Sequence, residues 1–93
     1  MADVTEEEAN SPLDFPMRFP VKAMGKSEDG FTELVESLVR PLVDADGDFE
    51  VESRESSNGR FVSVTITFTA HSREQLDDVY RALTGHERIL YVL

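Results

Sequence analysis

The residues whose types could do chemistry gather in three short stretches: MGKSEDG at residues 24–30, DADGDFEVESRE at 44–55 and SSNGR at 56–60. A glycine and a lysine before a helix can offer backbone amides and positive charge to an anion. Aspartates at alternating positions can hold calcium. Serine, asparagine and arginine can contact a phosphate or carboxylate, or they can simply turn a hairpin.

The acidic stretch matches a calcium loop only in part. Asp44, Asp46 and Asp48 stand at the first, third and fifth positions of such a loop. Its glycine, Gly47, comes fourth, whereas the sharp turn of a calcium loop needs glycine at the sixth position. The second half of the stretch also alternates as a strand. We therefore expect an acidic turn and no metal site.

No set of residues completes a catalytic constellation. The chain has no cysteine, which excludes a thiol nucleophile, a thiolate metal site and disulfides. His71 and His86 flank an expected helix, and neither has a spaced partner for a metal site or a nucleophile–base pair. The serines lack a nucleophile elbow, and no glycine-rich phosphate loop is present. We predict a protein that is not an enzyme and binds no cofactor.

Met24, Gly25 and Lys26 form the first candidate contact for a ligand or partner. They end an expected strand and lead into an expected helix, so backbone amides and the positive end of the helix lie beside them. Lys26 adds positive charge, whereas Glu28 and Asp29 oppose an anion at the same terminus. The stretch is a candidate for binding and offers nothing for catalysis.

Ser56, Ser57 and Arg60 form the second candidate contact. The Asn58-Gly59 pair between them is preferred in two-residue type I′ turns, in which both residues have positive φ. Because that pair accounts for the turn, the three flanking side chains are left to contact a partner. We predict a hairpin in which Ser57 lies opposite Arg60.

Length and charge indicate one acidic domain. The 93 residues include 19 acids and 9 bases, for a formal net charge of −10. Residues 1–14 carry five of the acids, no base and no hydrophobic period, so we predict a disordered tail there and a single domain over 15–93. An acidic surface repels nucleic acid and anionic lipid. With no apolar membrane span, no signal or transit peptide and no cysteine, we expect a cytoplasmic protein.

Hydrophobic periodicity predicts six elements in the order β-α-β-β-α-β. Apolar residues alternate in the strands and recur every three or four residues in the helices. The predicted strands are 16–26, 49–55, 61–70 and 88–93; the predicted helices are 27–43 and 72–84.

Helix boundaries follow from capping residues and proline. Ser27, Glu28 and Asp29 predict a capped start for the first helix. Pro41 predicts a kink or an end of that helix near Arg40.

The second helix has its own boundary signals. Ser72 and Gln75 have the spacing of a capping box at its start. Gly85 is suited to a left-handed residue at its end.

The central hairpin has one register that satisfies its apolar residues. Counting outward from Asn58-Gly59 places Val51 opposite Ile66 and Phe49 opposite Phe68. A shift of one residue would place Val51 opposite a threonine on the wrong face. The hydrophobic pattern and the turn position therefore agree.

The element order predicts an α+β fold of the ferredoxin-like class. Two β-α-β units then form a four-stranded antiparallel sheet with both helices on one face. Right-handed crossovers place the first and third strands in the centre, which gives the strand order 4-1-3-2.

Three segments carry a resemblance to a known family: FPMRFPVKAMGK, SSNGRFVSVTITFTAHSREQLDDVYRAL and the terminal ILYVL. Their order resembles the YbeD-like family of small bacterial proteins over about residues 13–93. Members share an "FP…K.MG" opening and an "SS.G.Y.SVT" hairpin, and Phe61 stands where many have tyrosine. The resemblance implies a ferredoxin-like fold similar to ACT regulatory domains. Those domains bind amino acids at the first strand–helix junction, often across a dimer interface, which would place a ligand near residues 24–30. The family's gene lies beside lipoate-synthesis genes in some bacteria.

These observations favour a regulatory or adaptor domain that binds a partner protein or a small metabolite. RNA binding is the main alternative, because RNA-recognition modules share this topology, but they need aromatic residues on the open sheet face. That face of the third strand carries Ser63, Thr65 and Thr67. An acylphosphatase-type enzyme is a further alternative. Its phosphate loop needs an arginine after the first strand, where this chain offers only Lys26.

Overall fold

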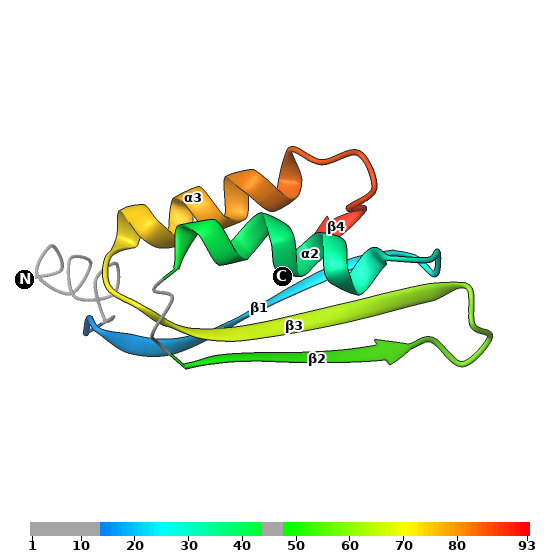
Figure 1. The fold of residues 1–93 in the computed structure, drawn as a ribbon, viewed down its shortest axis with the longest axis horizontal. Helices are drawn as coiled ribbons and strands as arrows, with labels where there is room; N and C mark the ends of the chain where they lie inside the picture. The colour runs from blue at the N-terminus through cyan, green and yellow to red at the C-terminus, as the bar shows by residue number, and fades with distance from the viewer. Residues whose placement is uncertain (1–13, 44–47) are drawn as a thin grey trace, which may run out of the picture.

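The computed structural model describes residues 14–43 and 48–93 (Figure 1). Most of the predicted acidic tail, residues 1–13, and most of the predicted acidic turn, residues 44–47, lie outside the described residues. The elements are β1 (Met17–Lys26), α2 (Phe31–Val39), the 3₁₀ turn η1 (Arg40–Leu42), β2 (Phe49–Glu55), β3 (Phe61–Ala70), α3 (Arg73–Thr84) and β4 (Tyr91–Val92).

The four strands form one antiparallel sheet in the order β2-β3-β1-β4. Both helices cover the same face of this sheet and leave the other face open (Figure 1). The ferredoxin-like fold and the strand order predicted from the sequence are confirmed. Neither helix within residues 14–43 and 48–93 has the length and apolarity needed to cross a membrane.

The core lies between the sheet and the helices. Strict alternation along β1 and β3 turns every second residue towards α2 and α3. The buried hydrophobic side chains of this core are Val21, Ala23, Phe31, Val35, Val39, Val62, Val64, Ile66, Phe68, Ala70, Leu76, Val79, Leu83 and Ile89.

The start of α2 differs from its prediction. The capping residue is Gly30, in the left-handed conformation at φ 80°, and no side chain caps the helix. The prediction that Ser27, Glu28 and Asp29 supply the cap is wrong, because the chain turns once more before the helix begins. At the other end, α2 stops at Val39 and Pro41 lies in η1.

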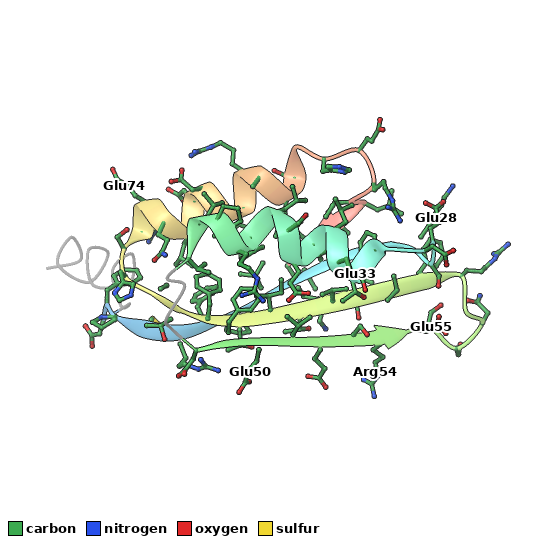
Figure 2. The ribbon with its side chains drawn as sticks, in the orientation of Figure 1. Glu28, Glu33, Glu50, Arg54, Glu55 and Glu74 are labelled. Carbon is green, nitrogen blue, oxygen red and sulfur yellow. The ribbon has the colours of Figure 1, made fainter. Side chains whose placement is uncertain are left out.

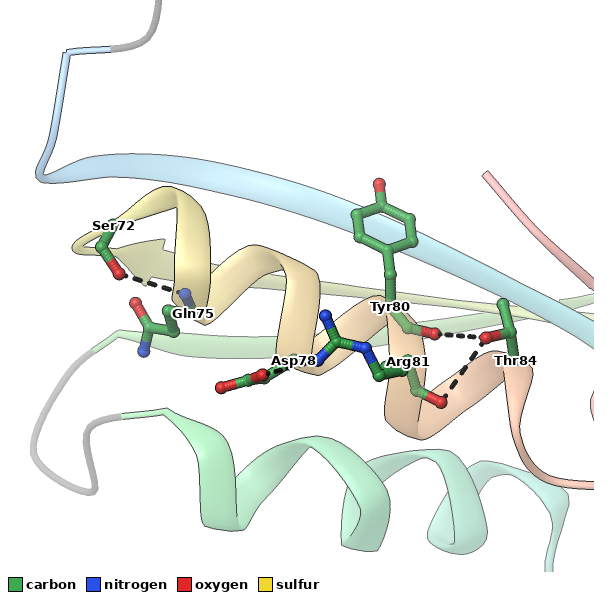
Figure 3. A network of polar contacts seen from close by, with 6 residues as sticks. All are labelled: Ser72, Gln75, Asp78, Tyr80, Arg81 and Thr84. Atoms are coloured by element: carbon green, nitrogen blue, oxygen red, sulfur yellow. Dashed lines mark hydrogen bonds and ion pairs between the residues drawn. The ribbon is translucent and has the colours of Figure 1, made fainter.

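The start of α3 agrees with its prediction and its end does not. The Gln75 amide donates to Ser72 Oγ at 3.0 Å (Figure 3). Gln75 Oε1 accepts from the amide of His71, one residue before the expected partner. Gly85 has φ −82°, so the predicted left-handed cap is wrong. Its amide instead continues the helical bonding by donating to the Arg81 carbonyl at 3.0 Å.

The central hairpin keeps the predicted register but turns differently. Val51 pairs with Ile66 and Phe49 with Phe68, as predicted. The Gly59 amide donates to the Ser56 carbonyl at 2.9 Å, which centres the turn on residues 57 and 58. Gly59 has φ 73°, whereas no non-glycine residue within 14–43 and 48–93 has positive φ. The type I′ prediction is therefore wrong, since that turn needs positive φ at residue 58 as well.

Candidate functional site

The two candidate contacts predicted from the sequence meet at one end of the sheet. Lys26 pairs with Phe61 across β1 and β3. The Ser27 amide donates to the Arg60 carbonyl at 2.9 Å, and Ser27 Oγ donates to Glu55 at 3.2 Å. Segments about thirty residues apart in the sequence are thus joined at the hairpin end of the sheet.

Side-chain hydrogen bonds fix the hairpin turn internally. Ser56 Oγ donates to Asn58 Oδ1 at 2.9 Å and accepts from the Phe61 amide at 3.1 Å. Asn58 Oδ1 also accepts from the Arg60 amide at 3.0 Å. Ser56, Ser57 and Arg60 are all exposed, but the Ser56 hydroxyl makes its hydrogen bonds within the turn. These bonds hold the start of β3 in a fixed position.

Gly25 faces the opposite side from its neighbours Met24 and Lys26. It is buried under α2, and a Cβ atom there would contact the Phe31 ring and lie 2.6 Å from the Arg88 carbonyl oxygen. Close packing of the helix layer thus explains the glycine. Because Gly25 has no side chain, the Phe31 ring can pack directly against its backbone.

Alternation places a distinct set of side chains on the open face. One row crosses all four strands from Arg54 through Ser63 and Met24 to Tyr91. Phe61 and Lys26 form the next row towards the hairpin, about 7 Å along the strands. Figure 2 shows Arg54 pointing away from the helices. The open-face patch is defined as Lys22, Met24, Lys26, Arg54, Phe61 and Tyr91.

Exposed apolar side chains concentrate at this end of the molecule. Within residues 14–43 and 48–93 the exposed large apolar residues are Phe61, Leu90, Tyr91 and Leu93, with 40%, 56%, 56% and 57% of their surface accessible to solvent. They lie at the start of β3 and in or beside β4. Leu93 exchanges two backbone hydrogen bonds with Lys22, so it borders the patch.

The cations of the patch differ from most cations elsewhere. Arg18, Arg40, Arg81 and Arg88 make ion pairs with Asp48 and Glu50, Glu36, Asp78 and Glu28, respectively. Lys22, Lys26 and Arg54 have no carboxylate of the described residues within 4.0 Å. The patch therefore presents positive charge that the described part of the chain does not neutralise by direct pairing.

The hollows around the patch are shallow and open. One of about 100 Å³ is lined by residues that include Met24, Arg54 and Phe61. Another of about 490 Å³ lies around the end of the sheet, against Lys26 and Arg60. No buried side-chain polar atom among the described residues lacks a partner, and no group of three potential metal ligands occurs among them. The arrangement is suited to surface contact.

Tyr80 links the helix layer to the end of the chain. Its hydroxyl donates to the Leu93 carbonyl at 3.3 Å. Burial raises the pKa of the Tyr80 phenol above its ordinary value. The bond helps to fix the chain end beside Lys22 and so supports the margin of the patch.

Sequence reasoning found part of this surface and missed the rest. It named Met24 and Lys26 but missed the other four residues of the patch, which are Lys22, Arg54, Phe61 and Tyr91. Phe61 directly precedes the buried Val62, so alternation alone could have placed it on the open face. The expectation of an open face without aromatic residues is wrong at the hairpin end, although Ser63, Thr65 and Thr67 do lie on that face as predicted.

Comparison with known sequences identifies close relatives. A family model described as "Protein of unknown function (DUF493)" matches residues 10–93. A UPF0250 protein of Paraburkholderia phytofirmans is 47% identical over 83 residues, covering 89% of this chain and 93% of the relative. A UPF0250 protein of Chromobacterium violaceum is 42% identical over 87 residues, covering 94% and 98%. The predicted resemblance to this family is confirmed, and these names assign no activity.

Among solved structures, the solution structure of protein HP0495 from H. pylori is similar. Its TM-score is 0.70 at 13% sequence identity, over 87% of this chain and 85% of the other. At that identity the match supports the fold alone.

Proposed function

We propose that this chain, which belongs to the DUF493 family of proteins of unknown function, is a non-enzymatic adaptor or regulatory domain that docks a partner protein. The observation that carries the proposal is the open-face patch. It combines exposed aromatic side chains with cations that lack described ion-pair partners, on the face that the helices leave uncovered. Exposed aromatic residues with arginine are characteristic of contact surfaces between proteins.

The shape of the surface favours a macromolecular partner over a metabolite. Sites for small molecules are concave, commonly about 300–1,000 Å³, and enclose most of the ligand. The hollow beside Met24 and Phe61 measures about 100 Å³, and the larger one against Lys26 and Arg60 is open at the end of the molecule. A partner laid across the sheet would cover these side chains, whereas a small ligand would leave most of them in water.

A small anionic metabolite is the second candidate. The hollow of about 490 Å³ brings Lys26 and Arg60 together beside the first strand–helix junction. ACT domains bind amino acids at that junction, and the resemblance also links the family to lipoate synthesis. Titration with amino acids and lipoyl compounds, followed by amide chemical shifts, tests this candidate. An absence of shifts at residues 24–30 would exclude these ligands.

Site-specific photocrosslinking tests the adaptor proposal. A photoreactive amino acid replaces Phe61 or Tyr91 on the open face, and in a matched variant it replaces the exposed Asp77 on α3. In extract of the native cell, the first two variants should give an adduct of one discrete mass that the third does not give. Equal adducts from all three positions, or none from Phe61 and Tyr91, would contradict the proposal.

A further inference from the structure

We infer that the segment docked on the open-face patch is acidic and carries an apolar side chain between its carboxylates. This inference rests on the proposed function and specifies the chemistry of the partner. Three observations support it: the patch holds cations without ion-pair partners among the described residues, its centre has a small hollow, and both edges of the sheet are poorly suited to adding a strand.

Charge separates the patch from the rest of the molecule. The chain has a formal charge of −10, yet Lys22, Lys26 and Arg54 lie on one face with no described carboxylate within 4.0 Å; Glu52 lines a hollow with Lys22 and Arg54 but pairs with neither. Partner carboxylates would supply the missing counterions. Ion pairs at the rim of an interface chiefly increase association rate and specificity.

The cations surround an apolar centre. Lys22 and Lys26 lie two residues before and after Met24 on β1, and Arg54 lies in the same row as Met24, two strands away. The hollow of about 100 Å³ beside Met24, which Glu55 also lines, is smaller than the roughly 150 Å³ cavity that admits benzene. It therefore suits an aliphatic side chain, with acidic residues of the same segment reaching the cations on either side.

The edges of the sheet are poorly suited to adding a strand. On the edge strand β2, every second residue lies on the open face and is charged: Glu50, Glu52 and Arg54. Charged side chains commonly protect edge strands from pairing with another strand. On the other edge, Lys22 bonds to Leu93, so Pro20, two residues earlier, faces the same edge and offers no amide. The face is thus a better docking surface than either edge.

An acidic protein segment fits the patch better than RNA does. Phe61 and Tyr91 have the aromatic faces on which bases stack. However, Glu50 and Glu52 lie on the same face, and the net charge of the chain repels a phosphate backbone. Three cations are enough to pair with the few carboxylates of a short protein segment, whereas the phosphates of RNA require a longer row of cations.

The test uses short synthetic peptides with one central leucine and flanks of glutamate only, glutamine only or lysine only. Each is titrated into the full chain at low salt, and amide shifts of the patch residues are followed. The glutamate peptide should bind about tenfold more tightly than the glutamine peptide, and its affinity should fall as salt is added. The lysine peptide should produce no shifts at Met24, Phe61 or Tyr91.

Two variants separate charge from a general loss of structure. Lys26→Gln/Arg54→Gln should abolish the difference between the glutamate and glutamine peptides. Arg81→Gln, which removes an exposed cation from α3, should preserve it. Equal binding of both peptides by the wild-type chain would overturn the acidic inference and leave the docking face intact. If none of the peptides shifts the patch amides, both the acidic inference and the proposal of a docking face lose their support. An oligouridylate is titrated in the same way, and stronger shifts with it than with the glutamate peptide would also overturn the acidic inference.

Discussion

The two faces of the sheet have opposite characters, although the same strands build both. Towards the helices, β3 presents Val62, Val64, Ile66, Phe68 and Ala70, all of which are buried. Towards the open side it presents Phe61 and a series of serine and threonine residues. The helix-covered face holds the buried core, whereas no helix covers the open face (Figure 1).

Charge shows the same contrast. In the helix layer, Arg40 pairs with Glu36 at 2.8 Å, and Arg81 with Asp78 at 3.1 Å. On the open face, Lys22, Lys26 and Arg54 have no such pairing among the described residues. The open face has ion pairs of its own, since Arg18 pairs with Asp48 and Glu50 at the far end of β1, but its hairpin end leaves exposed both apolar surface and these cations.

Two phenylalanines of β3 give the largest expected difference between the faces. Phe68 is 0% exposed under the helices, and Phe61 is 40% exposed on the open face. Phe68→Ala should lower the free energy of unfolding by about 3–5 kcal/mol, because it removes buried area and leaves a cavity. Phe61→Ala should lower it by less than about 1 kcal/mol. Urea denaturation measures both, and equal losses would contradict the assignment of the faces.

Gly25 and Met24 are neighbours on β1 that face opposite sides, and they provide the next contrast. Gly25→Ala should cost about 1–3 kcal/mol by overpacking against Phe31. Adding Phe31→Leu should recover part of that loss, which a double-mutant cycle in urea would detect. A Gly25→Ala variant as stable as the wild type would show that the helix layer does not pack tightly on this face.

Ser72 caps a helix, whereas Ser27 is a residue of a type that often caps helices but does not cap α2. Ser72→Ala should cost about 1 kcal/mol, because the amide of Gln75 loses its acceptor. Ser27→Ala should have little effect on α2, whose cap is Gly30, since Ser27 contributes only an exposed bond to Glu55. Thermal unfolding of both variants measures the contrast, and an equal loss from Ser27→Ala would restore the predicted cap.

The smallest expected effect concerns Tyr80, where the helix layer meets the border of the patch. Its pKa is raised by burial, so the unfolded chain releases the phenolic proton at lower pH than the folded chain. The resulting stabilisation is present below about pH 10 and is lost as pH rises above it. The stability advantage of the wild type over Tyr80→Phe should therefore shrink as pH rises above about 10. A constant difference would contradict this account.

Local patterns in the sequence were enough to predict the fold. Alternation along β3 predicted the buried face, and the position of Asn58-Gly59 predicted the pairing of Val51 with Ile66. These features depend on neighbours in the sequence and on a period of two. They also placed Met24 and Lys26 correctly at the end of β1.

The features that the sequence did not predict depend on contacts between distant segments. The register of β4 places Tyr91 beside Met24, and nothing local in RILYVL specifies that pairing. The cap of α2 lies at Gly30 because the chain must first turn away from the sheet. The hairpin turn is set by the Ser56 and Asn58 side chains, which compete with the backbone geometry that the residue pair alone prefers.

The central claim is that the open face of the sheet docks a partner protein. The most direct measurement captures that partner from native extract with three tagged chains: wild type, Phe61→Ser/Tyr91→Ser and Glu74→Lys/Asp77→Lys, the last altered on exposed positions of α3. All three should unfold at similar temperatures. The wild type and the α3 variant should retain the same protein, and the open-face variant should lose it. Retention by the open-face variant, or loss from the α3 variant alone, would contradict the account.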